Sequence, residues 1–107
     1  MSVQHSLPDA VKFFAYDFVV EACYLVGQED RALGAVEATR RYLPSAQEEA
    51  ERDLKAYLPE LRFCERGIGL LADAGDIEQA LSLCDLALEL GLGRAYESKR
   101  QSLERRL

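Results

Sequence analysis

Prolines and glycines divide this chain into segments that are otherwise built from strong helix formers. The segments are rich in Ala, Leu, Glu, Arg and Gln, and they contain no Asn-Gly or Asp-Gly turn and no long alternating run of β-branched residues. The dividing residues are Pro8, Pro44, Pro59, Gly27, Gly75, Gly91 and Gly93. The sequence therefore predicts an all-α fold of about six helices and no sheet.

The helices are predicted over residues 8–26, 29–43, 45–58, 59–74, 76–90 and 93–107. Pro44 is expected to end the second helix, because the residue before a proline is pushed out of the α region. Ser45 and Glu48 fit a capping box that would begin the third helix. Pro59 either kinks one long helix over 45–74 or begins a new helix, and the cost of a proline inside a helix favours the new start.

Two helix–turn–helix units recur along the chain, one turning at Gly27 and the other at Gly75. When these glycines are superposed, Ala32 falls on Ala80, and a small residue there suits two antiparallel helices that cross about 8–10 Å apart. We therefore expect one domain over residues 1–107, made of a first hairpin (about 8–44), an intervening helix (45–58), a second hairpin (about 59–92) and a C-terminal capping helix (93–107).

The two units resemble the tetratricopeptide repeat, a helical hairpin of about 34 residues. The better match is AGDIEQALSLCDLALEL, residues 74–90, with a Gly-Asp turn and small residues at Ala80 and Ala87. The matching residues of the first unit are Tyr16, Gly27, Ala32 and Pro44. The turn glycines lie 48 residues apart, so a plain helical bundle stays open as the alternative. The resemblance implies a right-handed superhelix of hairpins that binds a peptide or helix.

Composition narrows the class of protein. Thirteen Lys and Arg against nineteen Asp and Glu give a net charge of -6, which argues against a general nucleic-acid binder. No apolar stretch reaches the length of about 18 residues that a membrane-spanning helix needs.

The start MSVQHSLPDA lacks the features of a signal peptide. The three cysteines, Cys23, Cys64 and Cys84, form no CxxC, so we expect a reduced, cytoplasmic protein.

Motifs for catalysis and cofactor binding are missing from the sequence. It holds no Gly-rich phosphate loop, no GxSxG and no HExxH. His5 is the only histidine, and one histidine with three scattered cysteines does not make a zinc site. The basic segment 94–107 is interpreted as a solvated capping helix. We expect no enzymatic activity, no cofactor and no metal.

The first predicted helix is the most unusual segment, since beyond Asp9 in its first turn only Lys12, Asp17 and Glu21 interrupt its apolar circumference. Such a helix needs cover on two sides. One apolar stripe is Val11, Phe14, Phe18, Ala22 and Leu25, and a second is Phe13, Tyr16, Val20, Cys23 and Tyr24. In one interpretation, four aromatic and apolar residues stay outside the core and anchor a partner, and three charged residues orient it. The anchors are Phe13, Tyr16, Val20 and Tyr24, and the orienting charges are Lys12, Asp17 and Arg40. In the other, the third or the C-terminal helix covers the stripe.

The function predicted from these features is a non-catalytic protein–protein interaction module, an adaptor or a small chaperone, that binds a protein, peptide or helix. Two hairpins alone rarely make a stable solenoid, so we also expect a homo-oligomer, a dimer. The alternatives are a homodimeric structural bundle without a separate ligand and a small-molecule-binding helical protein, which would need a closed cavity.

Overall fold

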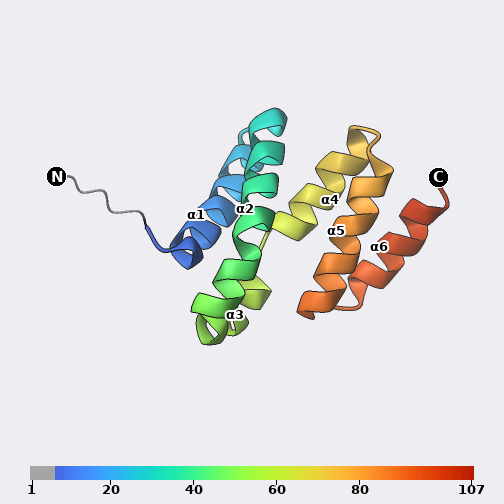
Figure 1. The fold of residues 1–107 in the computed structure, drawn as a ribbon. Helices are drawn as coiled ribbons and strands as arrows, with labels where there is room; N and C mark the ends of the chain where they lie inside the picture. Colours follow the sequence, from blue (N-terminus) through green and yellow to red (C-terminus); the bar gives the residue numbers. More distant parts are fainter. Residues whose placement is uncertain (1–6) are drawn as a thin grey trace.

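The computed structural model describes residues 7–107, and every regular element in this range is helical. The elements are α1 (Asp9–Leu25), α2 (Glu29–Glu49), α3 (Glu51–Tyr57), the 3-10 turn η1 (Leu58–Glu60), α4 (Phe63–Asp73), α5 (Ile77–Leu90) and α6 (Ala95–Glu104) (Figure 1). The predicted all-α class with six helices is confirmed. His5, the single histidine, lies outside the described residues.

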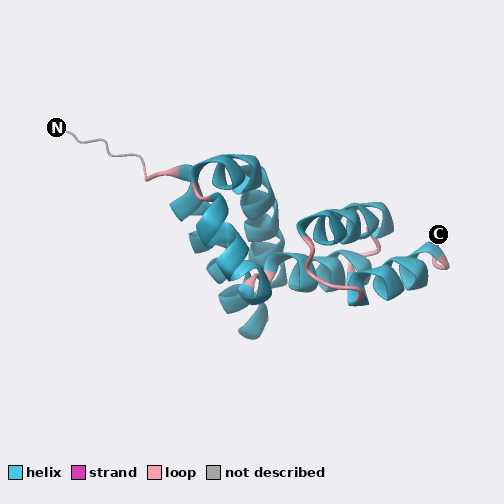
Figure 2. Ribbon diagram, turned by 90° about the horizontal axis from the view of Figure 1, so that it is seen from below, coloured by secondary structure: helices cyan, strands magenta, loops and turns pink. Residues whose placement is uncertain are grey.

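The helices form an elongated stack of 53 × 29 × 20 Å. α1 packs against α2, α4 packs against α5, and α4 also contacts both helices of the first pair. α6 packs against α5, so α1 and α6 lie at opposite ends of the molecule (Figure 1). Figure 2 shows the short loops that join the helices. α4 thus meets both helices of the first hairpin, α5 meets α6, and α1 lies at one end of the stack.

Both predicted hairpin turns form at their glycines. Gly27 and Gly75 have φ angles of 77° and 84°, a left-handed conformation that glycine adopts without a Cβ penalty. After the second turn, the Asp76 carboxylate accepts a hydrogen bond from the Gln79 N–H at 3.3 Å and caps α5 as predicted. Ala32 and Ala80 are fully buried, which fits their predicted place where the helices of each hairpin cross.

The prediction that Pro44 ends the second helix is wrong, because α2 continues through it to Glu49. The proline is exposed, whereas Leu43 and Ala46 on either side of it are buried in the core. Burial of these neighbours holds the segment helical despite the missing backbone donor. Ser45 therefore lies inside α2 and makes no capping box.

The chain between α2 and α4 is neither one kinked helix nor the predicted 45–58 helix. The backbone breaks at Ala50 (φ −144°, ψ 45°), and the short α3 follows. Pro59 lies in η1, and Leu61 is extended and buried, so α4 begins at Phe63 instead of Pro59. The predicted break near Pro59 is correct, but the start of α4 is four residues later.

The centre of the core lies where α4 passes between the other helices. The rings of Phe13 and Phe63 meet edge to face at 5.8 Å between centroids. At Gly67 an added Cβ would lie 2.6 Å from Leu83 Cδ2 and 2.9 Å from Val36 Cγ1. The contact of α4 with α2 and α5 therefore depends on a residue without a side chain.

Between residues 7 and 107 no helix combines the length and apolar character needed to cross a membrane. The same range brings no three His, Cys, Asp or Glu side chains together as potential metal ligands.

Candidate functional site

The inward face of α1 carries two of the predicted partner anchors, and for these the prediction is wrong. Phe13 and Val20 are fully buried. Phe13 packs edge to face against Phe14 at 5.2 Å and against Phe63 at 5.8 Å between ring centroids. The Phe13 and Val20 side of α1 therefore faces the core, where Phe13 meets Phe63 of α4, and these two residues cannot contact a partner.

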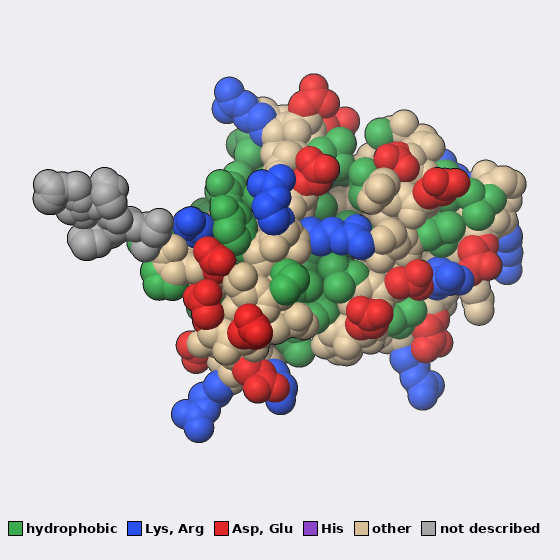
Figure 3. All heavy atoms as spheres, in the orientation of Figure 1, with side chains coloured by type: hydrophobic (Ala, Val, Ile, Leu, Met, Phe, Trp, Pro, Cys, Tyr) green, Lys and Arg blue, Asp and Glu red, His purple; other side chains and the backbone are tan. Residues whose placement is uncertain are grey.

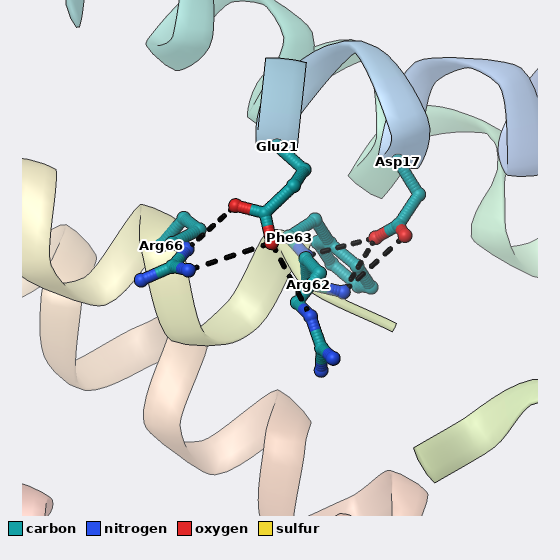
Figure 4. Close-up of polar contacts among 5 residues, drawn as sticks. All are labelled: Asp17, Glu21, Arg62, Phe63 and Arg66. Carbon is teal, nitrogen blue, oxygen red and sulfur yellow. Dashed lines mark hydrogen bonds and ion pairs between the residues drawn. The ribbon is translucent and has the colours of Figure 1, made fainter. Parts of the chain in front are cut away.

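Asp17 is also an inward residue and not an orienting charge at the surface. Its carboxylate accepts hydrogen bonds from the backbone N–H groups of Arg62, at 3.0 and 3.2 Å, and of Phe63, at 2.8 Å (Figure 4). These N–H groups lie at the start of α4, so a side chain of α1 caps the N-terminus of another helix. Burial raises the pKa of Asp17 above its ordinary value, and the hydrogen bonds from Phe63 and Arg62 act in the opposite direction.

One turn further along α1, Glu21 binds two arginines of the α4 region. Its carboxylate lies 3.3 Å from Arg62 Nε and 2.8 Å from Arg66 Nε (Figure 4). The Arg66 guanidinium also lies 4.2 Å from the centroid of the Tyr24 ring. Tyr24 is partly exposed as predicted, but one face of its ring is occupied by Arg66.

Of the remaining predicted residues, Tyr16 and Lys12 of α1 contact α2, and Arg40 belongs to α2. The Tyr16 ring stacks on Tyr42 with centroids 5.8 Å apart, and Lys12 Nζ lies 5.4 Å from the Tyr42 centroid. Arg40 Nη2 donates to Ser82 Oγ at 2.6 Å across a groove of about 840 Å³ between α2 and α5, which Figure 3 views face on. The seven predicted site residues therefore do not form one surface.

The outward face of α1 forms a continuous apolar surface that we call the outer face. Its members, all exposed, are Val11, Ala15, Phe18, Val19, Ala22, Leu25 and Val26. Phe18 and Leu25 are exposed by 75% and 69%. At about 100° per residue these positions fall within an arc of about 120°. None of the four charged residues of α1 falls in that arc.

Such a face is unusual for the end of a helical stack. An ordinary surface helix turns a polar stripe to the water, and large exposed apolar patches mark interaction sites. The first helix was expected to be covered on two sides, but other helices cover only its inner side. α3 reaches no further than a contact between Tyr57 and Phe14, with ring centroids 5.1 Å apart, and α6 lies at the far end (Figure 1).

A shallow hollow of about 290 Å³ extends the outer face toward α3. It is lined by apolar side chains that include Phe14, Phe18 and Tyr57, and by polar ones that include Glu60 and Arg62. Apolar side chains are visible along the α1 edge of the molecule in Figure 3. The candidate site is therefore the outer face with this hollow on its border.

Sequence reasoning found the apolar circumference of this helix but chose the wrong stripe as exposed. The signal that identifies the outer face is the arc without a single charge. Charged side chains such as Asp17 and Glu21 usually mark the side of a helix that faces water. In the structure both carboxylates face α4, where Asp17 accepts a hydrogen bond from the Phe63 N–H and Glu21 forms an ion pair with Arg66.

Comparison of the chain with protein-family models, with curated proteins and with solved structures finds no match.

Proposed function

We propose that this protein is a non-catalytic protein–protein interaction module and that the outer face of α1 is its docking surface for an apolar helix. The observation that carries the proposal is the uncharged, exposed arc of α1. Anchors at i, i+3, i+4 and i+7 are the usual way in which one helix recognises another surface. Phe18 and Leu25 have this spacing and are the two most exposed apolar side chains within α1.

The docking surface is held rigidly from behind. Phe13 and Val20 fix the inner side of α1 in the core, and Asp17 and Glu21 tie it to the α4 region. A surface that does not have to be ordered during binding loses less entropy when a partner arrives. This supports recognition by a preformed helix face.

A tetratricopeptide-like architecture and a cytoplasmic setting belong to the same proposal. The antiparallel hairpins, with turns at Gly27 and Gly75, support the first. Three free cysteines support the second, since a reduced compartment keeps thiols unpaired. Burial raises the pKa of the Cys64 thiol to about 12, which suits an inert core residue better than a reactive one.

The test is affinity capture from the lysate of the native host. Phe18→Asp places a charge in the outer face, and Leu107→Asp is the matched control, since Leu107 is 73% exposed and lies past α6 at the other end of the chain. We expect wild type and the control to retain the same protein and Phe18→Asp to lose it, with unchanged helical circular dichroism. Equal capture by all three, or no capture by wild type of any protein, the native copy of this chain included, would contradict the proposal.

A further inference from the structure

We propose that the helix which docks on the outer face is α1 of a second copy of this chain, paired antiparallel about a two-fold axis close to Phe18 and Val19. The inference rests on the proposed function and names the partner of that same surface. The spacing, symmetry, charge and area of the outer face support this pairing.

The spacing is that of a helix–helix seam. Val11, Ala15, Phe18, Ala22 and Leu25 follow one another at intervals of 4, 3, 4 and 3 residues, the interval pattern of a heptad repeat. A seam with this pattern keeps facing a second helix that runs alongside it. The outer face therefore fits a helix over its whole length and not a single point of contact.

The same residues satisfy the symmetry that a dimer of identical chains requires. In a two-fold interface, if residue i contacts residue j, then j contacts i. With the axis near Phe18, Val11 of one copy lies beside Leu25 of the other, and Ala15 lies beside Ala22. Each Phe18 lies beside its own counterpart. The order large, small, large, small, large reads alike in both directions, so every side chain meets one of similar size.

The two alanines set how close the helices come. Ala15 and Ala22 lie near the middle of the exposed arc, whereas Phe18 and Val19 lie toward its two sides. Methyl side chains at the crossing let helices approach to about 8 Å. The larger side chains then pack along both sides of the seam, and Phe18 lies next to the hollow that Phe14 and Tyr57 line.

Charges on the borders of the outer face do not oppose this pairing. At a rise of 1.5 Å per residue, the two Lys12 side chains are separated by about 20 Å along the seam. The two Glu21 side chains come closer, but each already binds Arg62 and Arg66 of its own chain. Antiparallel pairing therefore brings no uncompensated like charges together.

The area of the outer face reaches the lower limit for a specific dimer. With about 150–200 Å² for a fully exposed Val, Leu or Phe side chain, the exposed fractions of these residues leave roughly 500 Å² of apolar surface on each copy. A symmetric pair that covers all of this surface buries about 1,000 Å² before the alanines are counted, which is the lower limit for biological interfaces.

Sedimentation velocity over a concentration series tests the pairing. We expect dimers for wild type and for Leu107→Asp, and monomers for Phe18→Asp. Because Ala22 is exposed, Ala22→Arg blocks the seam without touching the core and gives a second monomeric variant should Phe18→Asp unfold. High salt should leave the dimer intact, since no ion pair holds it.

Cysteine cross-linking tests the antiparallel direction. On a Cys23→Ser background, Ala15→Cys and Ala22→Cys are prepared separately and then mixed under mild oxidation. Antiparallel pairing gives a cross-linked dimer only in the mixture, because Cα atoms more than about 7 Å apart cannot be bridged. A cross-link in either variant alone indicates parallel pairing and overturns the geometry.

The outcomes separate this inference from the proposed function. A wild-type chain that stays monomeric to millimolar concentration overturns the second copy as partner. If Phe18→Asp then still abolishes capture of another protein, the docking surface stands with a different occupant. A dimer that persists in both Phe18→Asp and Ala22→Arg overturns the inference and removes the support for the outer face as a docking surface.

Discussion

Gly67 of α4 lies where α2, α4 and α5 meet. A Cβ at this position would come within 3 Å of Leu83 and Val36 side-chain atoms, closer than carbon atoms normally approach. We expect Gly67→Ala to lower the free energy of unfolding by about 1–3 kcal/mol, because the packed core must shift to admit the methyl group. Urea denaturation followed by circular dichroism measures the change.

Gly69, two residues further along the same helix, is the matched control. It is exposed, and an added Cβ would meet nothing within 4 Å. Gly69→Ala should raise the free energy of unfolding by up to about 1 kcal/mol, since alanine is the better helix former. Changes of the same sign and size in both variants would show that Gly67 is not a contact point.

Asp17 makes the stability of the fold depend on pH. Burial raises its pKa in the folded state above the ordinary value of 3.8, so the folded protein holds the proton more tightly than the unfolded chain does. The resulting stabilisation is complete below the unfolded pKa and is lost as pH rises through the raised folded pKa. Wild type should therefore lose stability relative to Asp17→Asn as pH rises from 3 to 7.

Paired urea denaturation of the two proteins across that pH range gives the difference in their free energies of unfolding. The comparison cancels the titration of the other carboxylates, which both proteins share. A difference that moves in favour of wild type as pH rises would mean that the hydrogen bonds from Phe63 and Arg62 outweigh burial, and that the folded pKa of Asp17 is lowered.

At the scale of elements, α2 contains a proline in its interior. Pro44 has no N–H to donate to the Arg40 carbonyl, yet it is exposed, so an alanine fits without disturbing the core. Pro44→Ala should raise the free energy of unfolding by about 1–3 kcal/mol through the added backbone hydrogen bond and better helix propensity. A loss of stability would indicate that the proline positions the last turns of α2.

Short sequence motifs predicted the helix ends correctly where the neighbouring residues alone determine them. The turns at Gly27 and Gly75 and the cap at Asp76 follow from short motifs, and all three form. Pro44 shows the limit of such rules, because the burial of Leu43 and Ala46 overrides them. A helix boundary that depends on tertiary packing cannot be read from the residues around it.

The rotation of α1 could not be predicted for a related reason. Its orientation depends on Asp17 and Glu21 reaching Arg62, Phe63 and Arg66, which are 45 or 46 residues away in the sequence. Charged residues usually mark the solvent side, so the sequence favoured the opposite rotation. The exposed apolar arc therefore lies on the predicted helix, but on the side opposite to Phe13 and Val20.

At the scale of the whole molecule, the two ends of the stack differ. α6 buries Tyr96 and Leu103 against the rest of the chain and exposes residues such as Glu97, Ser98, Lys99, Gln101 and Ser102. α1 buries its inner side and exposes an apolar arc. A stack of helical repeats needs a polar outer face at each end, and one end lacks it. Pairing through α1 would leave a dimer with a polar α6 at both ends.

Pairing of two chains through α1 should couple folding to association. If the pair dissociates on unfolding, mass action stabilises the folded dimer as the protein concentration rises. A tenfold increase in concentration should raise the thermal midpoint of wild type by about 3–5 °C for a chain of this size. Phe18→Asp should unfold at a midpoint independent of concentration, close to that of highly diluted wild type, because its core is unchanged. Leu107→Asp should follow wild type, and parallel curves for all three proteins would contradict the coupling.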